Sequence, residues 1–123
     1  MAQWGRSVDA APGVVAKGKL GKRSVILALA AFAAGAVALA TMVALPSNAS
    51  ALAQNIATSA FMAVFLLAAP LAHIVGLIFG LMALARSNDS RLLGVVGILL
   101  NGISLAAGIL LVVAMASSIG AYT

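Results

Sequence analysis

The chain has 123 residues, of which 64% are hydrophobic and 7% are charged, and its mean hydropathy is +1.21. This composition lies well outside that of soluble domains and indicates that lipid is the solvent. The absence of cysteine excludes disulfides and thiol nucleophiles. The net charge of +5 does not indicate a nucleic-acid-binding module, because five of the seven Lys and Arg residues precede the first apolar run.

Residues 1–23 mix small, polar and basic residues with a proline and four glycines, and they predict an irregular cytoplasmic basic arm. We expect the four basic residues nearest the first apolar run to lie beside anionic lipid headgroups. These residues are Lys17, Lys19, Lys22 and Arg23.

Residues 24–123 predict a three-span transmembrane domain. The first span covers 24–45 and ends before Pro46, and it is longer than the roughly 7 to 15 apolar residues of a signal peptide. A polar stretch at 47–60 predicts a loop before the second span, 61–85. Pro70 removes a backbone donor inside that span, so we expect a kink near Leu66.

Residues 86–91 form a compact polar cluster typical of a turn, and the third span follows at 92–116. The predicted fold class is therefore an all-α integral membrane protein with three transmembrane helices. All seven Lys and Arg residues belong to the arm and this turn, whereas the 47–60 loop and the tail hold none. The positive-inside rule then predicts a cytoplasmic N-terminus and an external C-terminus.

Small and polar residues form one helical stripe on each of the last two spans, at spacings of three and four. Folding the chain back at 86–91 pairs the two stripes and predicts a tight antiparallel hairpin, since close approach drives helix association in lipid. In this register Gly80 faces Gly97, and His73 lies within reach of Ser104 or Asn101. The register pairs Ala83 with Gly94, Gly80 with Gly97, Gly76 with Asn101, His73 with Ser104 and Ala69 with Gly108. The stripes are Ala69, His73, Gly76, Gly80 and Ala83, then Gly94, Gly97, Asn101, Ser104 and Gly108.

His73 has a second interpretation besides hydrogen bonding within the hairpin. With Ala69 it forms an Ala-x-x-x-His arrangement that resembles the pigment site of bacterial light-harvesting polypeptides. That resemblance implies bacteriochlorophyll or haem bound through His73. Because the sequence has a single histidine, one copy cannot supply two axial imidazoles.

Residues 70–113 resemble a widespread bacterial membrane domain of unknown function that is built as a two-helix hairpin. The resemblance implies a hairpin in a bacterial inner membrane, and it supplies no activity. The matching residues are Gly76, Gly80, Ala83, Leu84 and Arg86, then Arg91, Leu92, Gly94, Gly97 and Gly102.

The predicted spans contain no Asp, Glu, Lys, Arg or Cys, so they lack the groups that usually carry catalysis or mark an ion path. We therefore expect no enzyme activity and no catalytic or metal site. The sequence favours a non-enzymatic subunit that packs against other integral membrane proteins of a larger complex. A pigment- or haem-associated subunit and a small oligomeric pore are the alternatives.

Overall fold

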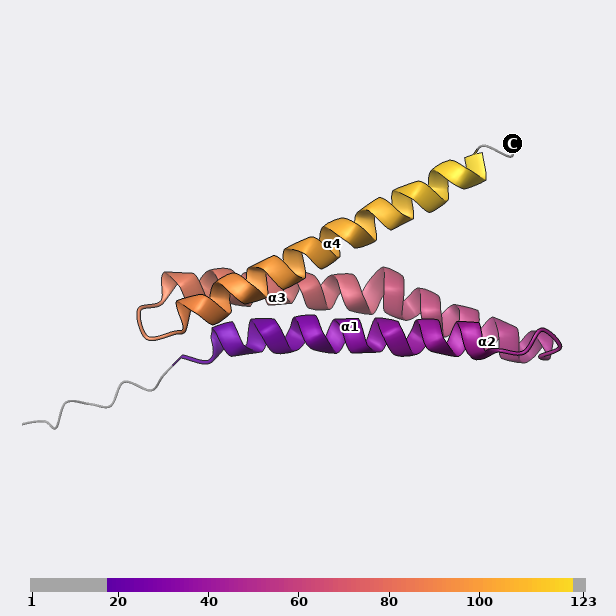
Figure 1. The fold of residues 1–123 in the computed structure, drawn as a ribbon, viewed down its shortest axis with the longest axis horizontal. Coiled ribbons are helices and arrows are strands. Elements are labelled where there is room, and N and C mark those ends of the chain that lie inside the picture. The colour runs from indigo at the N-terminus through magenta and orange to yellow at the C-terminus, as the bar shows by residue number, and fades with distance from the viewer. Residues whose placement is uncertain (1–17, 121–123) are drawn as a thin grey trace, which may run out of the picture.

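The computed structural model describes residues 18–120, and within this range the chain is helical apart from its turns (Figure 1). Three helical stretches are long and apolar enough to cross a membrane, which confirms the all-α multi-pass fold. The elements are α1 (Leu20–Ala44), α2 (Ala51–Ala63), the π-helical turn η1 (Val64–Ala68), α3 (Ala69–Ala85) and α4 (Arg91–Gly120).

Helix α1 begins at Leu20, four residues before the expected start of the first span, and so takes in the end of the predicted basic arm. Lys22 and Arg23 are exposed there. Their long side chains can reach headgroups while the backbone remains helical. The helix ends at Ala44 because Leu45 adopts extended backbone angles before Pro46, as expected.

The predicted loop at 47–60 is wrong over most of its length, because α2 begins at Ala51. The Ser50 hydroxyl oxygen accepts a hydrogen bond from the Ala53 N–H at 3.2 Å and caps the helix. The Gln54 side chain donates to the Ala49 carbonyl at 3.0 Å. Polar residues in this segment suggested a loop, but they lie on a helix that continues into the membrane span.

A kink was expected near Leu66, and this position lies in η1, one π-helical turn between α2 and α3. The Ala69 N–H donates to the Val64 carbonyl, five residues earlier. Pro70 follows directly and has no N–H to offer the Leu66 carbonyl. A widened turn is a known way for a helix to accommodate such a defect.

Helix α1 packs against both α3 and α4. Helix α4 runs antiparallel to α3 from their shared turn, crosses it, and then stands away from the bundle (Figure 1). Residues 109–118 of α4 are all exposed. The predicted hairpin is therefore tight in the half near the turn and open in the other half.

The interior of the described bundle is made of small and polar groups. Its two largest fully buried side chains are Asn101 and Ser24, whereas the large apolar side chains face outward. This arrangement suits a lipid solvent, in which apolar side chains gain little from touching one another and close packing with hydrogen bonds holds helices together.

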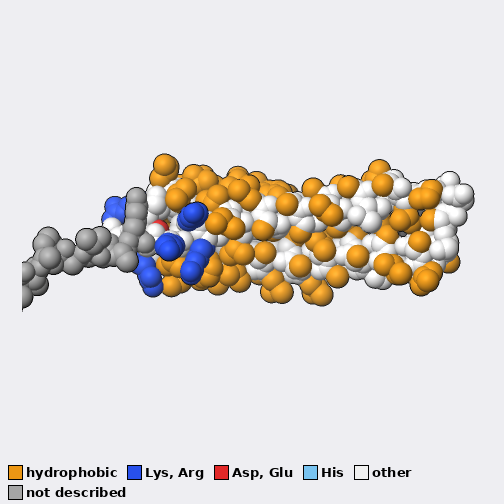
Figure 2. Space-filling view, turned by 90° about the horizontal axis from the view of Figure 1, so that it is seen from below, with side chains coloured by type: hydrophobic (Ala, Val, Ile, Leu, Met, Phe, Trp, Pro, Cys, Tyr) orange, Lys and Arg blue, Asp and Glu red, His pale blue; other side chains and the backbone are white. Residues whose placement is uncertain are grey.

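The charged side chains gather at one end of the molecule, where α1 begins and α3 turns into α4 (Figure 2). No charged side chain occurs between residues 24 and 85, or between 92 and 120. The arm-side and turn-side cations therefore share one end of the bundle, as the three-span topology requires.

Candidate functional site

A hydrogen-bonded cluster joins all three spans at the centre of the bundle. The Ser24 hydroxyl of α1 donates to the Gly76 carbonyl of α3 at 2.7 Å. The Asn101 amide of α4 donates to the Ser24 carbonyl at 3.1 Å and to the Gly97 carbonyl at 2.7 Å. Both side chains are fully buried. We call Ser24, His73 and Asn101 the polar core.

His73 belongs to this polar core through its Nδ1 atom, which lies 2.9 Å from the Asn101 Oδ1 atom. Because the Asn101 Nδ2 atom is already directed at carbonyl oxygens, Oδ1 is the acceptor and Nδ1 carries the hydrogen. The Phe32 ring of α1 contacts the imidazole edge to face, with ring centroids 5.7 Å apart. The expectation that His73 lies within reach of Ser104 or Asn101 is confirmed through Asn101. Ser104, the partner of His73 in the predicted register, makes no hydrogen bond to it.

The other ring nitrogen of His73, Nε2, has no hydrogen-bond partner among the described residues. His73 as a whole is only 6% exposed. In the tautomer with hydrogen on Nδ1, Nε2 carries the lone pair that a ligand would use.

The glycines of the stripes make room for this polar core. A Cβ atom added at Gly76 would lie 2.5 Å from the Asn101 amide, and one added at Gly97 would overlap the Ser24 side chain. A Cβ added at Gly80 would lie 3.1 Å from the Ser24 hydroxyl oxygen. Gly80 and Gly97 therefore both border Ser24 of α1, which neither the stripes nor the hairpin register anticipated.

The predicted pairing of the stripes holds only near the turn. The position of a Cβ at Gly94 is 3.2 Å from the Ala83 Cβ atom, as the expected register requires. At the far end, nothing lies within 4 Å of a Cβ at Gly108, so its expected pairing with Ala69 is wrong. The Ser104 hydroxyl donates to the Leu100 carbonyl of its own helix at 2.5 Å.

A second polar contact fixes the start of α1 against the turn between α3 and α4. The Asp89 carboxylate accepts hydrogen bonds from the backbone N–H groups of Leu20 at 2.8 Å, Gly21 at 3.3 Å and Ser90 at 2.8 Å. The Asn88 carbonyl accepts another from the Gly18 N–H at 2.8 Å. The turn thus caps the N-terminus of a helix that is distant in sequence.

The hydrogen bonds also set the ionisation of Asp89. Burial raises the pKa of this carboxyl, but the backbone N–H groups of Leu20, Ser90 and Gly21, together with the nearby Arg86 charge, outweigh burial and lower it. Asp89 is therefore ionised at neutral pH and can interact favourably with the positive end of the α1 dipole.

Sequence reasoning missed Ser24 and Asp89. The predicted first span begins at Ser24, to which the sequence assigned no partner. A signal was present, because Gly21, Ser24, Ala28 and Ala31 recur at spacings of three and four.

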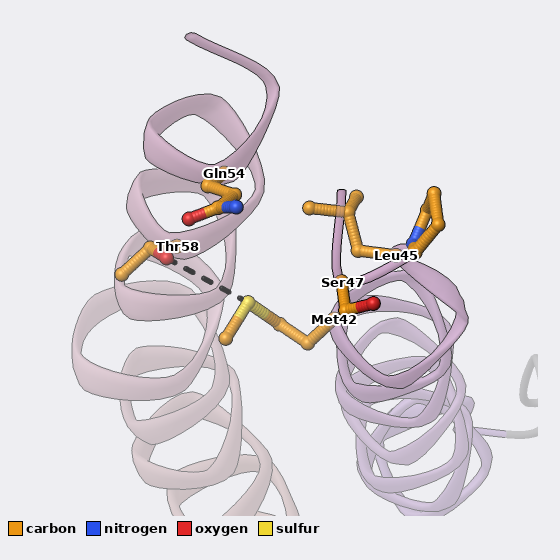
Figure 3. A pocket seen from close by; sticks show the side chains of 6 residues that line it. Met42, Leu45, Ser47, Gln54 and Thr58 are labelled. Atoms are coloured by element: carbon orange, nitrogen blue, oxygen red, sulfur yellow. Dashed lines mark hydrogen bonds between the residues drawn. The ribbon is translucent and has the colours of Figure 1, made fainter. Parts of the chain in front are cut away.

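A hollow lies at the other end of the molecule, between the end of α1 and the start of α2 (Figure 3). Its volume is about 270 Å³, and the Thr58 hydroxyl lies 3.8 Å from the Met42 sulfur across it. Its lining residues are Met42, Leu45, Pro46, Ser47, Gln54 and Thr58. None of these lining residues has an ionisable side chain.

Three further predictions concern the headgroup-binding cations, a metal site and a pigment site. Lys19, Lys22 and Arg23 lie at the charged end, whereas Lys17 is outside the described range. No group of three or more metal-ligating side chains occurs within residues 18–120. The bacteriochlorophyll or haem interpretation of His73 stays a prediction.

Comparisons with protein-family models, with curated proteins and with solved structures found no match for this chain. The resemblance of residues 70–113 to a bacterial two-helix membrane domain therefore stays an expectation.

Proposed function

We propose that this small membrane protein is a non-enzymatic subunit that packs against other integral membrane proteins in a larger complex, in a bacterial inner membrane. The observation that carries the proposal is how the polar groups are used. Ser24 and Asn101 use their hydrogen bonds to join the three helices, and the Asp89 carboxylate uses its hydrogen bonds to cap α1. Away from the charged end, the surface that remains available for contact is mostly apolar.

The second half of α4 supports the same role. From residue 109 to 118 this helix stands apart from the bundle and is exposed on every side (Figure 1). An apolar helix that stands apart in this way leaves its surface available for a neighbouring transmembrane helix to pack on.

The experiment is purification of the full chain from its own membranes in mild detergent, followed by size measurement and identification of the proteins that co-purify in fixed proportion. We expect a complex larger than the chain with at least one other multi-pass protein. A monomer or homo-oligomer with no fixed partner would contradict the proposal. Rapid flux of ions or dye through liposomes containing the pure chain would instead favour the pore.

A pigment- or haem-associated subunit is the second candidate, and the Nε2 atom of His73, which has no hydrogen-bond partner among the described residues, favours it. Metal-ligating histidines usually donate the hydrogen on their other ring nitrogen to an oxygen that fixes the ring. Here the Asn101 Oδ1 atom accepts that hydrogen from Nδ1 of His73. Visible absorption of the purified native complex tests this candidate. A chromophore band that is lost in His73→Asn, which keeps a donor for Asn101, would support ligation.

A further inference from the structure

The charged end of the bundle brings cations from three chain segments together. Lys19, Lys22 and Arg23 belong to the start of α1, Arg86 follows the end of α3, and Arg91 begins α4. All five side chains are exposed. Their grouping follows from the Asp89 cap, because its bonds to Leu20 and Gly21 hold the start of α1 against the turn that carries both arginines.

The carboxylate at the centre of this group faces inward. Asp89 is only 9% exposed, and its oxygens accept from backbone N–H groups, not from arginine or lysine side chains of the described residues. Five cations and one carboxylate leave a formal charge of +4 at this end, within residues 18–120. Figure 2 shows blue side chains around this end with one small red area between them.

The depth of these cations in a membrane is set by the apolar residues beside them. The exposed side chains of Ile26 and Leu29 follow Arg23 on α1, and those of Leu92 and Val95 follow Arg91 on α4. With these side chains in hydrocarbon, the cations lie at the level of the lipid headgroups.

We propose that this basic collar, formed by Lys19, Lys22, Arg23, Arg86 and Arg91, binds the phosphate headgroup of an anionic phospholipid. Arginine suits this ligand because its planar guanidinium can bind phosphate oxygens in pairs. The expected arm residues supply part of the collar, and the two turn arginines complete it. This inference concerns the isolated chain and does not depend on any protein partner.

The test uses the pure full chain in phosphatidylcholine vesicles, with spin-labelled phosphatidylglycerol or spin-labelled phosphatidylcholine as the probe. The fraction of each probe that is immobilised at the protein gives a relative association constant. Both leaflets have the same composition, so either insertion direction reports the same site. We expect a preference for phosphatidylglycerol that falls with rising sodium chloride.

Arg86→Gln with Arg91→Gln should lower this preference, by about fivefold for each charge at low salt. Arg86→Lys with Arg91→Lys is the matched control and should retain most of it, and circular dichroism should show unchanged helix content in both variants. An unchanged preference in the Gln variant would overturn the proposal. So would its complete loss on adding inorganic phosphate at constant ionic strength, which would indicate a site for free phosphate.

Discussion

Asn101 is the residue on which the described bundle depends most. It is fully buried between the three apolar helices, and its amide reaches Ser24 of α1, His73 of α3 and the backbone of its own helix. An amide in such a place is costly unless its hydrogen bonds are made. Here they are made, so the residue links the helices instead of destabilising them.

Replacing Asn101 by Leu should lower the free energy of unfolding in detergent by about 1 to 2 kcal/mol. The estimate takes roughly 0.6 kcal/mol for each of two interhelical hydrogen bonds and adds the buried donor on His73 that loses its acceptor. Ile103→Leu, at a position 67% exposed on the same helix, is the control and should change stability little. Equal stability of the two variants would show that the polar core does not hold the bundle.

The glycines of α4 allow a second comparison at the residue scale. Gly97→Ala places a methyl group against Ser24, whereas Gly108→Ala meets nothing within 4 Å. We expect Gly97→Ala to lower the melting temperature, because overpacking costs about 1 to 3 kcal/mol. Gly108→Ala should raise it slightly, since alanine favours the helix by up to about 1 kcal/mol. The reverse order would contradict the position of Ser24.

Among the elements, α1 has the most unusual start. The residue before it, Lys19, makes no side-chain cap, and the caps for Leu20 and Gly21 come from Asp89, far along the chain. The first helix is therefore completed by the hairpin that follows it. Folding of the N-terminal turn of α1 should depend on prior formation of the turn at 86–91.

Stability should accordingly depend on pH through Asp89. Its pKa is lowered in the folded protein, so the folded state binds fewer protons than the unfolded state. This contribution is complete above the ordinary carboxyl pKa of about 3.9 and is lost as the pH falls further. Thermal unfolding in detergent should therefore show a decline in acid that Asp89→Ala lacks. Asp9, the other acidic residue of the sequence, is present in both proteins.

The sequence predicted some helix boundaries and missed one. The third span and the end of the second were correct to within a few residues because uninterrupted apolar runs set them. The start of α2 was missed because Gln54 and Thr58 resemble loop residues. The continuous helical stretch from Ala51 to Ala85 has 35 residues and is roughly 52 Å long. It must therefore extend beyond a hydrocarbon core of about 30 Å. Polar residues on that extension face headgroups or water.

For the polar core, the sequence predicted that α3 and α4 contribute residues to one site, but it did not predict the contribution of Ser24 from α1. The stripes on α3 and α4 mirror each other across a short turn, so the sequence predicted their contact near the turn. It did not predict that α4 diverges farther along, where Gly108 has no neighbour on α3. The position of α1 depends on which of several small-residue faces meets the hairpin. Alanine is so frequent in this chain that spacing could not distinguish them, and Ser24 decides the choice through its hydrogen bonds.

At the scale of the whole molecule, all described charges lie at one end, which predicts the orientation in the membrane. Single cysteines at Asn48 and Ser87 are both exposed, and the natural chain has no cysteine to interfere. A membrane-impermeant maleimide applied to intact cells should label position 48 and not position 87. Labelling of position 87 alone would place the basic collar outside.

Helix α1 docks on the α3–α4 hairpin, so the three helices form one unit. A Cβ at Gly21 would lie 3.1 Å from the Leu93 Cβ atom, close to the roughly 3.5 to 4.5 Å of a disulfide. Gly21→Cys with Leu93→Cys should therefore cross-link on mild oxidation in native membranes and resist maleimide labelling. Gly35→Cys with Gly108→Cys should stay reduced. Labelling of the first pair to the same extent as the second would contradict the docking of α1.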